Sequence, residues 1–137
     1  MLPTAIAVAP GIYLGPGKAQ LLRPGQYAVL LQSQAIVAGQ SSIAVQLERT
    51  KSGFFYPVGY SLEFQFSGAP GTFEIDVQTS DTDSDAFFVT NTKFTTAANL
   101  NSNNVGRIEM VTYWALYTRV SVPTLTNPVT LTAKLTR

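Results

Sequence analysis

The stretch that decides the fold is WALYTRVSV at residues 114–122, which is followed by PTLTNP at 123–128 and VTLTAKLTR at 129–137. Apolar and polar residues alternate with a period of two in both long segments. A β-strand with one buried side requires this pattern. The residues predicted to share the buried faces are Trp114, Leu116, Val120 and Val122 in the first segment and Val129, Leu131, Ala133 and Leu135 in the second. The end of the chain therefore predicts two strands joined by a turn.

The same alternation occurs in earlier segments. The residues predicted to point inward are Ile43, Val45 and Leu47 in 42–49, Leu62, Phe64 and Phe66 in 61–67, and Phe73, Ile75 and Val77 in 72–79. Segments 61–67 and 72–79 flank a Gly-Ala-Pro-Gly turn, so we expect them to pair as a hairpin. Counting all such segments predicts about eight or nine short strands and no helix. We therefore expect an all-β fold, an antiparallel two-sheet β-sandwich, with a jelly roll as one topology that would suit it.

Residues 1–17 differ from the rest of the chain. Their prolines and glycines exclude a helix and predict an extended N-terminal arm, with a short strand at 5–8. The remaining residues, 18–137, suit one sandwich domain. The arm is apolar but too short to form a core, so we expect it to contact a partner chain rather than its own domain. The arm residues expected to bind a partner are Leu2, Ile6, Val8, Ile12 and Tyr13.

The composition excludes several classes of function. Charged residues make up 12% of the chain, about half the usual share, and nine basic against eight acidic residues leave a net charge of +1. The basic residues are scattered, so we expect no direct binding of nucleic acid. The chain has neither cysteine nor histidine, which removes disulfides, thiolate metal sites and nucleophiles activated by histidine. We expect no membrane span and no cleaved signal peptide, because no apolar run is long enough and the N-terminus lacks a positively charged start.

The acidic residues offer a remaining route to chemistry. In the expected hairpin, Glu63 would lie across from Glu74 or Asp76 on the outward face. Two carboxylates can hydrolyse a glycosidic bond when they converge in a cleft. The ordinary alternative is that these carboxylates keep one face of a sheet hydrated, and we favour it.

The segment Asp-Thr-Asp-Ser-Asp at 81–85 resembles the opening of a calcium-binding loop. The rest of that pattern fails, because the sixth position is Ala86 rather than glycine and the twelfth is Thr92 rather than glutamate. We favour a solvated turn, with a weak calcium site as the alternative. We therefore predict no catalytic residue, no cofactor and no metal.

Aromatic residues are the best candidates for a contact surface. Trp114 shares its strand face with leucine and valine residues, so we expect it in the core. The cluster at 54–56 lies between Gly53 and Pro57, which indicates an exposed loop or strand edge. Large amphipathic rings on a surface can fill the pocket of a partner. The aromatic residues expected to bind a partner are Phe54, Phe55, Tyr56, Tyr113 and Tyr117.

The second half of the chain resembles a known family. The segments that carry the resemblance are GTFEIDVQTSDTDSDAFF at 71–88, GRIEMVTYWALYTRVSV at 106–122 and VTLTAKLTR at 129–137. They are similar to β-sandwich virion proteins of tailed bacteriophages, including head decoration or cement proteins. In these proteins a late strand with aromatic and Arg-Val residues pairs with a final Val-Thr strand. Similar patterns also occur in discoidin-like and carbohydrate-binding sandwiches.

The resemblance implies a non-enzymatic structural protein of a virion. It would be made in the host cytoplasm, lie on the capsid surface, and bind the major capsid protein or another virion protein. The weakly charged surface, rich in threonine, serine and asparagine, further suggests a homo-oligomer. A carbohydrate-binding or receptor-binding module is the alternative, and a glycosidase that uses Glu63 is a third hypothesis.

Overall fold

The alternating apolar side chains form one core between two sheets. The predicted inward residues of 61–67 and 72–79 are all buried, namely Leu62, Phe64, Phe66, Phe73, Ile75 and Val77. The computed structural model describes residues 3–6, 11–17, 19–51, 54–55, 58–95, 100–113 and 115–137, and at 50–51, 54–55, 58 and 111–113 the description is limited to the backbone. Trp114, expected in the core, lies outside the described residues.

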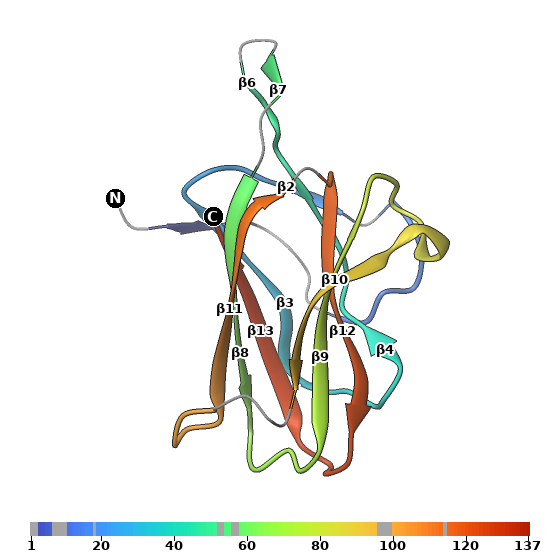
Figure 1. Cartoon of the computed structure of the whole chain (residues 1–137), viewed down its shortest axis with the longest axis vertical. Helices are drawn as coiled ribbons and strands as arrows, with labels where there is room; N and C mark the ends of the chain where they lie inside the picture. The colour runs from blue at the N-terminus through green and yellow to red at the C-terminus, as the bar shows by residue number, and fades with distance from the viewer. Residues whose placement is uncertain are drawn as a thin grey trace.

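Strands dominate the regular structure of the described residues (Figure 1). They are β1 (Thr4–Ala5), β2 (Gln20–Leu22), β3 (Gln26–Ala35), β4 (Gln40–Ser41), β5 (Val45–Leu47), β6 (Thr50–Lys51), β7 (Phe54–Phe55), β8 (Val58–Phe66), β9 (Phe73–Ser80), β10 (Val89–Thr95), β11 (Val105–Tyr113), β12 (Tyr117–Leu125) and β13 (Thr130–Thr136). A 3-10 helix, η1 (Asp85–Phe87), precedes β10. Within this part of the chain, no helix has the length and apolar character needed to cross a membrane.

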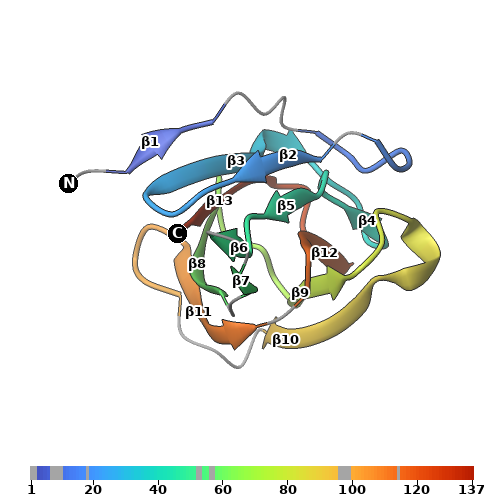
Figure 2. The ribbon, with the colours of Figure 1, turned by 90° about the horizontal axis from the view of Figure 1, so that it is seen from above.

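Two sheets pack against each other, as the view from above shows (Figure 2). One has the strand order β1-β3-β13-β8-β11, and the other has the order β10-β9-β12-β5-β2, with β4 also paired to β12. The predicted all-β sandwich is confirmed. Both sheets are mixed, because β1 joins β3 and β2 joins β5 in parallel, while the pairs between long strands are antiparallel.

The predicted hairpin of 61–67 and 72–79 is wrong. β8 pairs with β11 and β13 in one sheet, whereas β9 pairs with β10 and β12 in the other. The turn between β8 and β9 therefore carries the chain across the core, and the two apolar faces meet from opposite sides. β12 and β13 likewise lie in different sheets, so the turn at 123–128 does not make them hairpin partners. Period-two alternation identifies a strand's buried face but not its neighbour.

Four of the antiparallel pairs between the eight main strands are nested. β3 pairs with β13, β5 with β12, β8 with β11, and β9 with β10. The outermost pair thus joins the first of these strands, β3, to the last, β13, and the innermost pair, β9 and β10, is connected by residues 81–88. All the other connections between consecutive strands of the eight cross from one sheet to the other. The jelly-roll topology remains a prediction.

Several predicted boundaries need adjustment. Between β9 and β10, residues Asp85–Phe87 form η1, and β10 starts at Val89. β11 ends at Tyr113 and β12 starts at Tyr117, within the segment 114–122 that the sequence predicts as a strand. In the arm, the short strand is β1, earlier than the expected 5–8.

The described part of the N-terminal arm lies on its own domain. β1 pairs with β3, and the backbone N–H of Ile6 donates to Tyr27 at 3.0 Å. Ile6 and Ile12 are half-buried and pack against the core. The expectation that the arm leaves the domain body is therefore wrong for residues 3–6 and 11–17, because the edge of β3 offers hydrogen bonds and the core offers apolar contact. Leu2 and Val8 lie outside the described residues.

An aromatic cluster joins the two sheets near the strand end opposite the β6–β7 hairpin. The Phe64 ring meets Phe94 edge to face, with 4.8 Å between centroids, and Phe66 meets Phe73 in the same way at 5.0 Å. Gly106 lies directly across from Phe64 in the register of β11 and β8. A Cβ at Gly106 would come within 2.6 Å of the Phe64 ring. The cluster thus requires a residue without a side chain at this position.

Gly106→Ala should lower the free energy of unfolding by about 1–3 kcal/mol, since the added methyl forces Phe64 and Phe94 to move in a packed core. Gly68→Ala is the matched control, because its Cβ would meet Val129 at an ordinary 3.7 Å. Urea unfolding of both variants measures the difference. Equal stability of the two variants would contradict the packing described here.

Candidate functional site

The β6–β7 hairpin projects beyond the end of both main sheets (Figure 1). Its second strand is formed by Phe54 and Phe55, two of the predicted contact residues, of which the backbone is described. Tyr56 lies outside the described residues. Two consecutive phenylalanines, Phe54 and Phe55, therefore stand on a strand that projects beyond the main sheets (Figure 1).

Two further predicted contact residues have their backbones at the same end. Tyr113 closes β11 and pairs with Val58, the first residue of β8 after the hairpin. Tyr117 opens β12 four positions later and is half-buried. The fold thus brings Phe54, Phe55, Tyr113 and Tyr117 to one end of the sandwich.

Residues at the base of the hairpin are tied to the link between β11 and β12. Arg49, which directly precedes β6, is 2% exposed, and its Nε donates to the carbonyl of Ala115. The backbone N–H of Leu47 donates to the carbonyl of Leu116 at 2.7 Å. The hairpin therefore starts from a held position, which lowers the entropy lost when it binds a partner.

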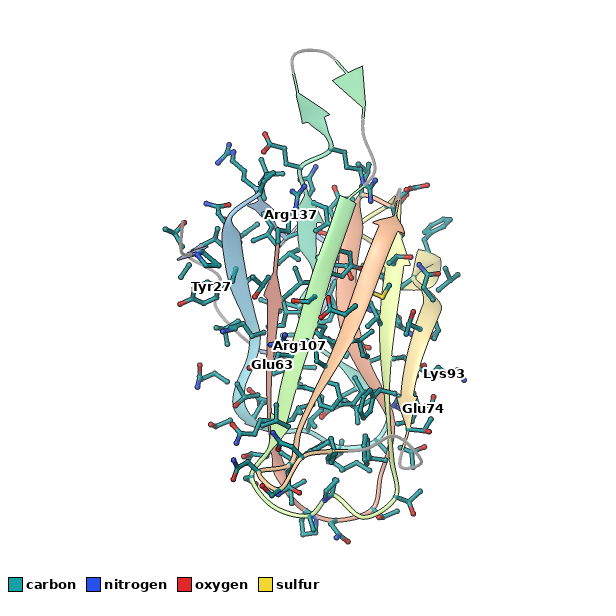
Figure 3. All side chains as sticks on the ribbon, turned by 60° about the vertical axis from the view of Figure 1, so that its left-hand side comes forward. Tyr27, Glu63, Glu74, Lys93, Arg107 and Arg137 are labelled. Carbon is teal, nitrogen blue, oxygen red and sulfur yellow. The ribbon has the colours of Figure 1, made fainter. Side chains whose placement is uncertain are left out.

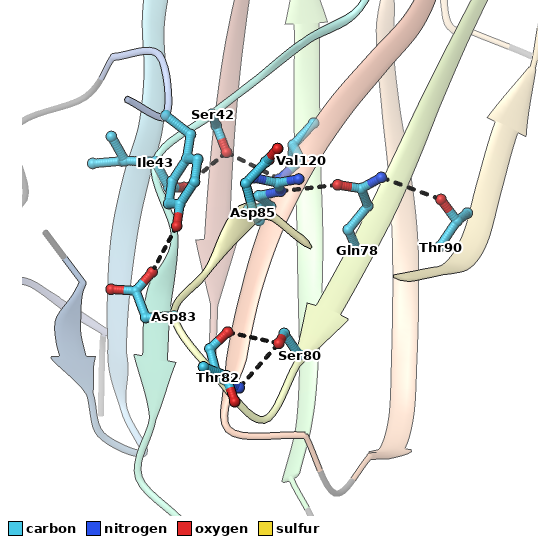
Figure 4. A network of polar contacts seen from close by, with 11 residues as sticks. Ser42, Ile43, Gln78, Ser80, Thr82, Asp83, Asp85, Thr90 and Val120 are labelled. Carbon is cyan, nitrogen blue, oxygen red and sulfur yellow. Dashed lines mark hydrogen bonds and ion pairs between the residues drawn. The ribbon is translucent and has the colours of Figure 1, made fainter. Parts of the chain in front are cut away.

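A second constellation surrounds Arg119 on the outer face of the six-stranded sheet (Figure 4). The Arg119 side chain is only 6% exposed. Its Nη1 donates to Asp85 Oδ1 at 2.8 Å and its Nε donates to Gln78 Oε1 at 2.9 Å. The guanidinium carbon lies 4.1 Å from the ring centroid of Phe88 and 4.7 Å from that of Tyr13, so both rings make cation–π contacts with it.

Tyr13 fixes the arm to this constellation. Its hydroxyl donates to Asp83 Oδ1 at 3.3 Å, and the backbone N–H of Gly17 donates to Asp83 Oδ2 at 2.8 Å. Burial, followed by the nearby charge of Asp83, raises the pKa of Tyr13. Tyr13 was predicted to bind a partner, but its ring is half-buried against its own domain.

The acidic segment 81–85 is engaged in these contacts. Asp83 holds the arm and Asp85 pairs with Arg119. Among the described residues, no group of three or more acidic side chains has the arrangement of a metal site. The calcium alternative has no geometric support.

Sequence reasoning did not find the role of Arg119. The alternation of β12 placed it on an outward face, where a solvated arginine is ordinary. The structure shows that the arm and the segment 81–88 cover that face. The residue pattern of one strand does not show whether a distant segment packs over it. The aromatic Tyr13 in the arm was a partial indication that the arm packs on a surface.

The predicted carboxylate pair across a hairpin does not form. Glu63 lies in β8 and Asp76 in β9, which belong to different sheets. Glu63 instead accepts a hydrogen bond from Arg107 Nη2 at 2.8 Å. The ion pair raises the pKa of Arg107.

Asp76 is unexpectedly buried on the outer face of β9, with 5% of its surface exposed. Thr90 Oγ1 donates to Asp76 Oδ2 at 3.0 Å, while Oδ1 has no hydrogen-bond partner among the described residues. Burial, and next the Glu74 carboxyl, raise the pKa of Asp76 to about 6, against the weaker opposing effect of Lys93. Lys93 Nζ lies closest to Glu74, at 3.6 Å from its Oε2. The titration of Asp76 therefore makes the stability of the fold depend on pH.

Comparison with known proteins gives no match. No family model, no curated protein and no solved structure is significantly similar to this chain. The resemblance to phage virion proteins therefore stays a prediction.

Tyr13→Ala should release the arm, because it removes the ring contact with Arg119 and the hydroxyl contact with Asp83. We expect faster amide hydrogen exchange at 11–17 and a loss of about 1–2 kcal/mol in the free energy of unfolding. Leu14→Ala is the control, since Leu14 is 92% exposed in the same segment. Unchanged exchange in the Tyr13 variant would show that the arm is held by other contacts.

Asp76→Asn should stabilise the protein at pH 7. The raised pKa means that the folded state favours the protonated carboxyl, so stability is lost as pH rises from about 4 to about 6. The neutral amide removes this loss, which is at most about 3 kcal/mol at pH 7, since the pKa shift of about two units corresponds to about 1.4 kcal/mol per unit.

Thermal unfolding between pH 4 and pH 8 measures this effect. The gain of the Asp76 variant over the natural chain should be small at pH 4 and reach its full size above pH 6. Asp81→Asn is the control, because Asp81 is exposed. An Asp76 variant that is less stable than the natural chain at pH 7 would refute the assignment.

Proposed function

We propose that the protein is a non-enzymatic structural protein of a virion, a decoration or cement protein that bridges and stabilises capsid subunits. The observation that carries the proposal is the β6–β7 hairpin, which projects from the end of the sandwich and carries Phe54 and Phe55 (Figure 1). Aromatic residues are frequent anchors of protein interfaces because a single ring buries a large area. The hairpin and the tyrosines at its end of the sandwich form the contact surface in this proposal.

The nested strand pairs support the proposal through the fold. Eight strands whose first pairs with the last, rolled into two sheets, fit a jelly roll, and we propose this topology for the chain. Jelly rolls are frequent in viral capsid proteins, although they also occur in lectin domains and enzymes. Fold alone does not decide function.

A bridging role has a direct physical basis. A protein that binds the assembled shell but not free subunits stabilises the assembly by mass action. Many copies on one shell add the effect of multivalency, and a homo-oligomer would add it within each binding unit. A contact surface with few charges would also make binding tolerant of salt.

Phe55→Ala tests the contact surface. We expect little change in melting temperature and at least about fivefold weaker binding to assembled particles that lack the protein, equivalent to ~1 kcal/mol. Phe87→Ala is the matched control, since Phe87 is 62% exposed in η1, away from the hairpin. Co-sedimentation with particles and thermal unfolding are measured for both variants. If both variants bind as the natural chain does, the hairpin is not the anchor.

A further inference from the structure

The outer face of the five-stranded sheet carries three connected hollows. Their volumes are about 470, 270 and 410 Å³ from one end of the sheet to the other. The first two share Tyr27, Glu63 and Lys134, and the last two share Gln65 and Thr132. Together they form one shallow channel, which we name the outer groove.

The outer groove follows the central strand of this sheet. Its lining extends along β13 from Thr130 to Thr136, a distance of about 20 Å at the usual rise of a strand. β3 borders it on one side, and β8 with Arg107 of β11 borders it on the other. Tyr27, Glu63 and Arg107 lie spread across this face in Figure 3. The groove is long enough for several sugar rings in a row.

One end of the groove is lined by two cationic side chains and one carboxylate. Lys134 Nζ lies 5.0 Å from the ring centroid of Tyr27, and Arg107 pairs with Glu63 at 2.8 Å. Tyr27 is half-buried. Glu63 balances one of the two cations, so this end of the groove keeps a net charge of +1 among tyrosine, serine and threonine side chains that can bind hydroxyl groups.

The other end is lined by uncharged amides and hydroxyls. Gln65 Nε2 donates to the carbonyl of Asn103 at 3.2 Å, which joins β8 to the loop at 101–104. That loop is ordered from within, because Asn101 Oδ1 accepts from the backbone N–H groups of Asn103 and Val105 at 2.8 and 3.0 Å. The rim of the groove is therefore formed before any ligand arrives.

Unusual backbone marks the same end. Among the described residues, Ser33 and Asn104 are the non-glycine residues with positive φ, at 46° and 59°, and both line this hollow. Such conformations are costly for a residue with a side chain and concentrate at ligand sites. Ser33 is held there by its backbone N–H, which donates to Thr132 Oγ1 at 2.9 Å.

We propose that the outer groove binds a linear oligosaccharide. A chain of sugar rings offers closely spaced hydroxyls that both donate and accept, which suits amides, hydroxyls and a paired carboxylate in a row. The pyranose ring also has an apolar face that can lie on Tyr27. A protein partner is disfavoured, since the polar lining lacks the apolar centre of a stable interface. The proposal is independent of shell binding and adds a second, glycan-directed surface.

The isolated protein is titrated with soluble linear oligosaccharides of glucose, of N-acetylglucosamine and of galacturonic acid, with binding followed by calorimetry and by NMR shifts. We expect at least one series to bind, with affinity that rises with chain length up to the length of the groove. Galacturonate as the only binder would place recognition on the unpaired charge of Lys134 rather than on the row of amides and hydroxyls, and would contradict the proposal.

Variants locate the binding. Gln65→Ala and Tyr27→Ala should each weaken binding about tenfold. Gln20→Ala is the matched control, because Gln20 is exposed on β2 of the other sheet. Unfolding curves show whether each variant folds, and Thr132→Ala replaces any that does not. No binding in any series, or binding that these variants leave unchanged, would overturn the proposal without bearing on shell binding.

Discussion

Most long strands of the described residues have one apolar face that must be buried against a second sheet, and this constraint organises the molecule. Strands that follow one another along the chain mostly pack their apolar faces together across the core. Most connections therefore cross from one sheet to the other. The alternate crossings produce the nested pairs β3–β13, β5–β12, β8–β11 and β9–β10. They also place most connecting segments at the two ends of the sandwich. The β6–β7 hairpin extends outward from one of these ends (Figure 1).

The two outer faces of the sandwich differ in whether other segments of the chain cover them. On the six-stranded sheet, the arm and the segment 81–88 close over Arg119, which binds both through Tyr13 and Asp85. On the five-stranded sheet, the polar residues of β8 and β13 line the outer groove and remain accessible. The chain thus covers one face with its own segments and leaves the other accessible. The projecting phenylalanines of β7 lie at one end of the sandwich, apart from the outer groove, which separates the proposed shell contact from the proposed glycan contact (Figure 1).

Sequence patterns predicted which residues of a strand face the core. They did not predict which strands pair or which distant segments pack over a face. The inward residues of β8 and β9 follow from alternation alone, because each strand must have one buried face. The pairing of those strands could not be predicted, since a short turn suits a hairpin and a crossing between sheets equally well. Asp76 was expected on a hydrated face, because its burial depends on Thr90 of β10. The burial of Arg119 could not be predicted either, because it depends on the distant arm. The outer groove could not be foreseen, because its lining comes from four strands that are far apart in the sequence.

The claim that this sandwich serves an assembled shell is tested most directly by the mass ratio of the protein to the shell subunit. Particles are purified by density gradient from the cells that produce the protein, and both chains are quantified by mass spectrometry. The account predicts a fixed ratio that persists through repeated sedimentation and in high salt. Recovery of the protein only in fractions free of particles would contradict it.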